Sequence, residues 1–67
     1  MRQESHDRVR AALHQLGDID REVITMRILE GVPAKQVGQI LGLSEAAVNT
    51  RQLRALRKLQ KLLGQPP

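Results

Sequence analysis

The sequence predicts a small all-α domain of four helices, and three observations support this fold class. Apolar residues recur at spacings of three and four in four successive segments, which is the period of helices with one buried face. Glycines and Pro33 fall between these segments, where they mark turns. The chain has 67 residues and no cysteine, so packed apolar side chains rather than disulfides must stabilise it. We expect a single domain over residues 1–64 and a disordered tail over residues 65–67.

The first two helices are predicted from their apolar stripes and their caps. Ser5 is expected to cap the first helix and Gly17 to end it. Its core-facing stripe is expected to be Val9, Ala12, Leu13 and Leu16. Asp20 is expected to cap the second helix, which Gly31 ends. The inward positions of that helix are predicted to be Val23, Met26 and one of Ile28 and Leu29.

The third and fourth helices are predicted with a sharp turn between them. Pro33 suits the first turn of the third helix, whose buried edge is expected to be Val37, Ile40 and Leu41. Gly42 can take a positive φ after that helix, and Ser44 can cap the next one, which is expected to run from Glu45 to Leu63. Its apolar side is predicted to be Val48, Ala55, Leu56, Leu59, Leu62 and Leu63. The opposite side carries Thr50, Arg54, Arg57 and Lys61.

The third and fourth helices have the pattern of a helix-turn-helix. Gly38 is small where the two helices are expected to approach closely, and Leu43 in the turn can fill the space between them. Two helices joined by a short glycine-containing turn, with a basic outer face on the second, are typical of a motif that inserts its second helix into the DNA major groove.

The distribution of charge also favours an anionic partner. The net charge is +4, but residues 1–34 carry five basic and six acidic residues, whereas residues 35–67 carry six basic residues and one acidic residue. The halves therefore differ, at −1 and +5. Such clustering of cations is the electrostatic footprint of nucleic-acid binding, although a basic helix face can also be simply a solvated surface. The chain has no aromatic residue, which excludes base stacking on aromatic rings.

Four stretches of the sequence form an ordered set of motifs: Asp20-Arg21-Glu22-Val23-Ile24, Val37 to Leu43, Ser44 to Arg51, and Arg54-Ala55-Leu56-Arg57-Lys58-Leu59. Together they resemble region 4, the C-terminal promoter-binding region of bacterial sigma-70 class sigma factors. They follow the family's order and spacing over nearly the whole chain, and the compact form looks closest to the extracytoplasmic-function group. Gln52 departs from the pattern, because the family commonly has an apolar residue at that position.

The resemblance implies roles for particular residues. The implied base-contacting residues, which would read the promoter −35 element, are Asn49, Thr50, Leu53 and Arg54. The implied phosphate-contacting residues are Lys35, Arg51, Arg57, Lys58 and Lys61. Arginine can bond guanine and asparagine can bond adenine through two hydrogen bonds. Leu53 is equally well explained as an ordinary exposed leucine. Five phosphate contacts would give a slope near −4.5 in log K against log salt.

The resemblance also implies double-stranded promoter DNA and the beta-flap of RNA polymerase core as partners, with an anti-sigma factor as a further possible partner. We expect a cytoplasmic monomer without membrane segments. The sequence shows no catalytic motif, metal site or cofactor site, so we expect no enzyme activity, no metal and no cofactor. Two alternatives stay open: the output domain of a dimeric LuxR-type response regulator, which predicts a palindromic DNA site, and a helical protein-interaction module.

Overall fold

The computed structural model describes residues 3–64, and side chains from residue 7 onward. These residues form α1 (Gln3–His14), α2 (Asp18–Ile24), η1 (Thr25–Leu29), α3 (Ala34–Leu41) and α4 (Glu45–Leu62). η1 is a π-helical turn that continues α2 without a break, so the described chain has four helical rods and no strand. The predicted all-α fold class of four helices is confirmed.

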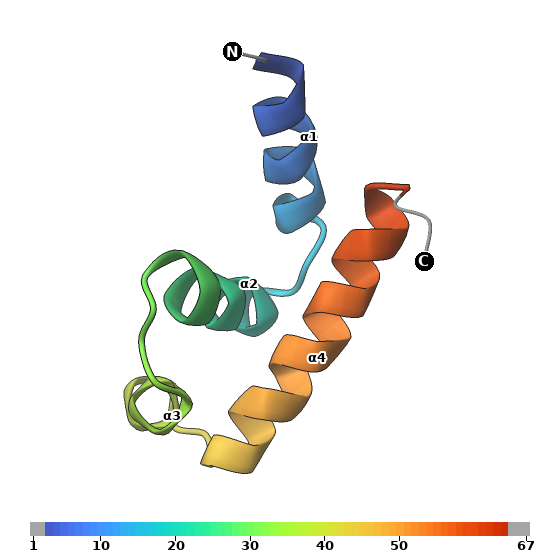
Figure 1. The fold of residues 1–67 in the computed structure, drawn as a ribbon. Coiled ribbons are helices and arrows are strands. Elements are labelled where there is room, and N and C mark those ends of the chain that lie inside the picture. Colours follow the sequence, from blue (N-terminus) through green and yellow to red (C-terminus); the bar gives the residue numbers. More distant parts are fainter. Residues whose placement is uncertain (1–2, 65–67) are drawn as a thin grey trace.

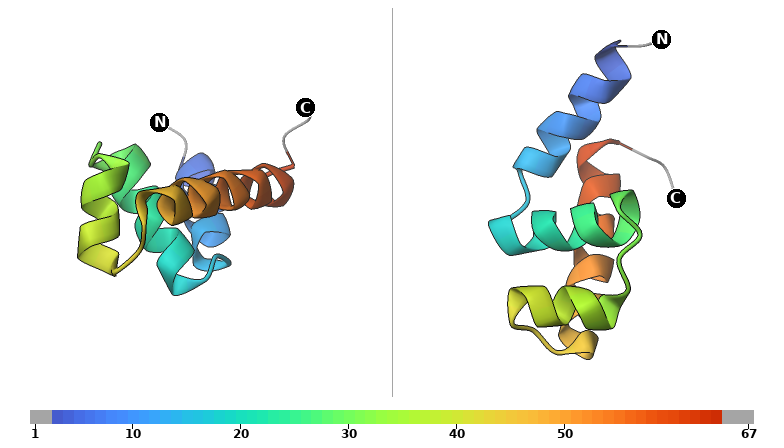
Figure 2. Two further views of the ribbon diagram at one scale, coloured as in Figure 1. Left: turned by 90° about the horizontal axis from the view of Figure 1, so that it is seen from below. Right: turned by 90° about the vertical axis from the view of Figure 1, so that its left-hand side faces the viewer.

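The long helix α4 is the element on which the others assemble. Figure 1 shows α3 beside the first turns of α4, the rod of α2 and η1 across its middle, and α1 beyond them. The two further views in Figure 2 show the same order along α4. Two hydrogen bonds join α1 and its following loop to the C-terminal part of the chain: Arg8 Nη2 donates to the carbonyl of Leu63, directly after α4, at 2.6 Å, and Lys58 Nζ of α4 donates to the Gln15 carbonyl at 3.1 Å.

The core is made of two small apolar clusters along α4. The first joins α2, α3 and the start of α4 through Val23, Ala34, Val37 and Val48, with Met26, Val32, Leu41 and Leu43 packed around them. The second joins the end of α1, α2 and the middle of α4 through Leu16, Ile24 and Ala55, with Leu13 and Leu59 beside them. The α3–turn–α4 motif therefore packs mainly on α2, and burial of these side chains holds it there.

The turn between α3 and α4 confirms the predicted helix-turn-helix. Gly42 ends α3 with φ +73°, a left-handed conformation that glycine adopts without steric cost. Ser44 caps α4, because its Oγ accepts a hydrogen bond from the Ala47 N–H at 3.0 Å. A Cβ on Gly38 would collide with the carbonyl oxygen of Leu43. Gly38 is therefore required by the backbone of the turn rather than by α4 itself.

Three predicted helix starts are wrong. α1 begins at Gln3, so Ser5 lies inside the helix instead of capping it. α2 begins at Asp18 after Gly17, which caps it without a side-chain hydrogen bond. Asp20 lies in the first turn of α2, where its carboxylate binds Arg51. Pro33 has an extended ψ of 146° and precedes α3 by one residue instead of lying in its first turn.

Several residues predicted to face inward are exposed. Ile28 and Leu29 are exposed because Arg27 follows Val23 by four residues and so shares its inward face. Ile40 is exposed because the inner stripe of α3 is Ala34, Val37, Gly38 and Leu41. Val9 lies one turn before Ala12 on α1 and is 45% exposed. Leu56 and Leu62 lie at the edges of the apolar side of α4 and are also exposed.

Candidate nucleic-acid interface

The residues predicted to contact bases form one surface on the first half of α4. This reading surface consists of Asn49, Thr50, Leu53 and Arg54, all of which are exposed. Asn49 and Leu53 are separated by one turn of helix, as are Thr50 and Arg54, so the four side chains adjoin one another. The surface begins directly after the turn capped by Ser44 and lies on the side of α4 opposite to buried Val48 and Ala55. The structure therefore brings all four predicted residues together.

The predicted phosphate contacts fall into two groups. Arg57 and Lys61 are exposed and continue along α4 from Arg54, while Lys35 is exposed in the first turn of α3. Within the described residues, none of these three cations forms an ion pair or a side-chain hydrogen bond. They remain directed to solvent on both sides of the turn.

Arg51 and Lys58 are instead engaged inside the domain. Arg51 Nη1 lies 3.0 Å from Asp20 Oδ1, which forms an ion pair between the middle of α4 and the first turn of α2. Lys58 Nζ donates to the carbonyl oxygen of Gln15 in the loop after α1. Arg51 lies on the flank of α4 that faces α2, whereas Lys58 is exposed and lies one turn from both Arg54 and Lys61.

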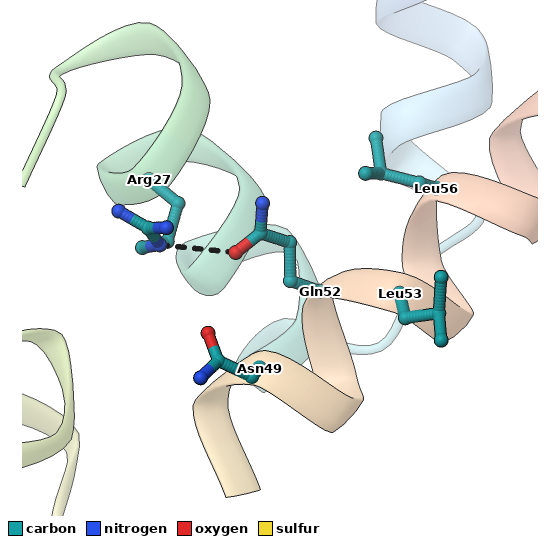
Figure 3. A pocket seen from close by; sticks show the side chains of 5 residues that line it. All are labelled: Arg27, Asn49, Gln52, Leu53 and Leu56. Atoms are coloured by element: carbon teal, nitrogen blue, oxygen red, sulfur yellow. Dashed lines mark hydrogen bonds between the residues drawn. The ribbon is translucent and has the colours of Figure 1, made fainter. Parts of the chain in front are cut away.

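Arg27 is a polar residue at this surface that the sequence reasoning missed. Its Nε donates to Gln52 Oε1 at 3.0 Å, and its Nη1 donates to the Val32 carbonyl at 3.0 Å. Figure 3 shows the five side chains that line an open hollow beside it, namely Arg27, Asn49, Gln52, Leu53 and Leu56. The signal was present in the sequence, because a cation four residues after Val23 must share its inward face and find polar partners there.

A second hollow lies between α1 and η1. It has a volume of about 410 Å³ and is lined by Val9, Arg10, Leu13 and Leu29. Three of these four residues are apolar, and Leu29 is 68% exposed. We call this the α1–η1 groove. Its described lining contains no residue of α4, so it is separate from the reading surface.

The described residues hold no group of three histidine or acidic side chains that could bind a metal ion. None of the helices in residues 3–64 combines the length and hydropathy needed to cross a membrane. The described surface contains a capped helix with a polar outer face, flanked by cations. Side chains of these types can form hydrogen bonds with base edges and ion pairs with phosphates.

Comparison with known proteins identifies the family. The family described as Sigma-70, region 4 matches residues 12–61, which include α3, the turn, all of α4 except its last residue, and the whole reading surface. The chain belongs to the sigma-70 region 4 family. This family is a non-enzymatic DNA-binding part of transcription factors.

Three curated relatives have similar sequences. The chain is 40% identical over 53 residues to the ECF RNA polymerase sigma factor ShbA of Streptomyces griseus, covering 79% of this chain and 28% of the relative. It is 35% identical over 52 residues to the ECF RNA polymerase sigma factor BldN of Streptomyces coelicolor, covering 78% and 20%. It is 30% identical over 59 residues to the RNA polymerase sigma-B factor of Bacillus subtilis, covering 88% and 22%.

These matches confirm the predicted likeness to the extracytoplasmic-function group. The chain spans less than a third of the length of each of these relatives, so they bear on one domain of a larger kind of protein. No solved structure matches the chain.

Proposed function

We propose that this domain reads the promoter −35 element as a monomer and helps to recruit RNA polymerase for transcription initiation. The observation that carries the proposal is the reading surface: four side chains able to contact bases stand exposed on the first half of α4, directly after a capped helix-turn-helix turn. Membership of the region 4 family and the sigma-factor relatives support the same role. Acting with the polymerase, the domain would work in the cytoplasm.

The residue types of the reading surface suit contacts in the major groove. Arg54 can donate two hydrogen bonds to O6 and N7 of guanine, and Asn49 can exchange two with adenine. Leu53 offers an apolar contact to a thymine methyl group, and Thr50 can bond any base edge within reach. Each two-bond pair discriminates against the wrong base by about 1–3 kcal/mol.

Phosphate contacts would come from both sides of the turn. Lys35 on α3 and Arg57 and Lys61 on α4 are exposed and without partners among the described residues, so we assign the phosphate contacts to them. Arg51 and Lys58 already bind within the domain. Three contacts at about 0.9 each give a slope near −2.7 in log K against log salt, rather than the −4.5 expected from five.

The α1–η1 groove is the candidate docking site for the polymerase beta-flap. It is apolar, exposed and separate from the reading surface, so polymerase and DNA could bind at the same time. An anti-sigma factor that covered either surface would block transcription. Weaker binding of polymerase core after Leu29→Glu is the expected outcome, because a charged side chain that must lose its water would replace an apolar contact.

Selection of bound duplexes from a random pool at low salt, followed by sequencing, tests the DNA assignment. We expect one short, non-palindromic motif, because a monomer imposes no two-fold symmetry on its site. A palindromic motif would indicate a dimeric regulator instead, and a pool without any motif would refute sequence-specific reading.

Two single substitutions then separate base contacts from phosphate contacts. Arg54→Ala should relax the preference at one position of the selected motif, whereas Arg57→Ala should weaken binding to all duplexes alike and reduce the salt slope by about one unit. Lys58→Ala is the matched control, because it removes the same charge from a side chain that binds Gln15. A smaller change in salt slope for Lys58→Ala than for Arg57→Ala is expected, and equal changes would contradict the assignment.

A further inference from the structure

Two consecutive residues in the middle of α4 bind opposite ends of the same neighbouring rod. Arg51 pairs with Asp20 in the first turn of α2, and Gln52 accepts a hydrogen bond from Arg27 in η1. We propose that these two pairs, the α4 clamp, fix the rotation of α4 about its own axis and so act as positioning residues for DNA reading. This inference rests on the proposed function and adds residues that contact no base themselves.

The apolar contact beneath α4 defines its rotation poorly. The buried residues of α4 that face α2 are Val48 and Ala55, which belong to the clusters of Val23 and Ile24. Ala55 presents only a methyl group, and the chain has no aromatic ring that could interlock with a partner. Because hydrophobic burial is non-directional, a small rotation over such a contact loses little free energy. Directional bonds to α2 and η1 therefore add to the turn and to the packing of α3 in selecting one orientation of α4.

The geometry of the clamp supplies that direction. Residues 51 and 52 leave α4 about 100° apart, and Asp20 and Arg27 are separated by seven residues, or about 10 Å along a helix. The two bonds therefore lie on either side of the Val23 and Ile24 contacts, each with donor and acceptor 3.0 Å apart. Rotation of α4 in either sense would stretch one bond or the other, and hydrogen bonds weaken steeply as their geometry departs from ideal.

The end of the clamp in η1 is itself held. Besides Gln52, the Arg27 guanidinium binds the carbonyl of Val32 through Nη1 at 3.0 Å. Val32 N–H in turn donates to the Met26 carbonyl at 2.8 Å, which anchors the segment between η1 and α3. Figure 3 shows the bond from Arg27 reaching Gln52 from the side of α4 that also carries Asn49. Gln52 thus meets a guanidinium fixed at a second point rather than a mobile side chain.

The reading surface lies on the same helix as the clamp. A rotation of α4 therefore displaces the side chains that are proposed to contact bases. At an overall helix radius of about 5–6 Å, a rotation of about 10° moves a surface side chain by about 1 Å. Hydrogen bonds between N–H and O tolerate only about 0.5 Å of variation in length. The two-bond contacts proposed for Asn49 and Arg54 should therefore depend on the clamp, whereas single phosphate contacts should not.

The test compares discrimination in Asp20→Asn, Gln52→Leu and the double variant, each in the whole chain. Discrimination is the ratio of Kd for a duplex with one changed base pair to Kd for the selected duplex. We expect each single variant to reduce this ratio about fivefold, which corresponds to about 1 kcal/mol. Binding to random duplex should not weaken in either single variant, and it should tighten in Asp20→Asn, which frees Arg51 for a phosphate. Gln52→Glu, which keeps an acceptor for Arg27, should retain the ratio.

Asp18→Asn is the matched control. Asp18 also lies in the first turn of α2 and forms an ion pair, but its partner is Arg21 of the same helix and not α4. The control should keep the wild-type ratio. Unchanged ratios in both Asp20→Asn and Gln52→Leu would overturn the clamp, and so would an equal loss in Asp18→Asn.

A second measurement is independent of DNA. Residual dipolar couplings of α2 and α4 in the free chain report the orientation of one helix relative to the other. The double variant should show a changed or averaged orientation of α4 at a temperature where circular dichroism shows that it is still folded. Identical couplings in the double variant and the wild type would overturn the clamp. If the wild-type domain selected no DNA motif, the proposed function would be refuted, but the dipolar couplings would still decide whether the clamp orients α4.

Discussion

Substitution of Gly38 by alanine should destabilise the domain although alanine is the better helix former. A Cβ at this position would overlap the Leu43 carbonyl oxygen and lie 3.3 Å from the carbonyl carbon. The neighbour is backbone, and the Leu43 N–H is bonded to the Gly38 carbonyl at 2.8 Å, so the turn cannot move aside freely. Overpacking typically costs about 1–3 kcal/mol. The gain in helix propensity offsets about 1 kcal/mol of that cost.

The difference is a net loss of about 0–2 kcal/mol, and because the clash is with backbone we expect Gly38→Ala to lie in the upper half, at about 1–2 kcal/mol. For a domain of this size each kcal/mol lowers the thermal midpoint by about 4–8 °C, so the midpoint should fall by about 5–15 °C. Circular dichroism at 222 nm during heating measures this shift, because the described residues are largely helical. The whole domain is expected to have only about 3–10 kcal/mol of stability, so the effect is large in proportion.

Gly17→Ala is the control for the Gly38 experiment. No atom lies within 4 Å of a Cβ built on Gly17, and its φ of −62° suits any residue. Alanine there restricts the unfolded chain but caps a helix less well than glycine, and these opposing effects should leave stability within about 0.5 kcal/mol of the wild type. If Gly38→Ala melted at or above the wild-type temperature, the close approach of the turn would not be what requires glycine.

Two further substitutions test the cap of α4 and the α1–η1 groove. Ser44→Ala removes the acceptor for the Ala47 N–H and should cost about 1 kcal/mol in thermal unfolding, with Ser44→Thr retaining most of the stability; a wild-type midpoint for Ser44→Ala would mean that the cap contributes nothing. Leu29→Glu should weaken binding to polymerase core about tenfold or more and leave DNA binding unchanged. Ile40→Glu on α3, also exposed but outside the groove, should affect polymerase binding little, and equal losses for the two variants would argue against the groove.

The local parts of the fold were predictable because single residue types decide them. The left-handed position after α3 admits glycine at low cost, and a serine hydroxyl reaches the N–H three residues later, so Gly42 and Ser44 gave the turn correctly. Asp20 shows where this reasoning stops. A carboxylate near a helix start is able to cap, but its actual partner is Arg51, 31 residues away, which competes for it only once the chain has folded.

The positions of the reading-surface residues were also predictable from local geometry, whereas the partners of the residues on either side of that surface were not. A helical wheel gives each side chain an angle, so Asn49 and Arg54 could be placed away from the core. The wheel does not tell what lies beside each flank of α4. The Gln15 carbonyl binds Lys58 and the Asp20 carboxylate binds Arg51, and both positions depend on how α1 and α2 pack. Arg27 was missed because its partners, Gln52 and Val32, also come from packing.

The internal use of cations has a consequence for selectivity. Binding to random DNA depends on phosphate contacts, whereas discrimination between sequences depends on base contacts held in place. Arg51 and Lys58 would each add to phosphate binding if they faced DNA, but the structure uses them to hold α4 against α2 and the end of α1. Removing two phosphate contacts weakens specific and random binding together, while a fixed helix favours the specific complex alone. Asp20 neutralises Arg51, so the net charge of +5 on residues 35–67 overstates the positive charge that this half offers to phosphates, and the expected gain in selectivity comes from the fixed helix alone.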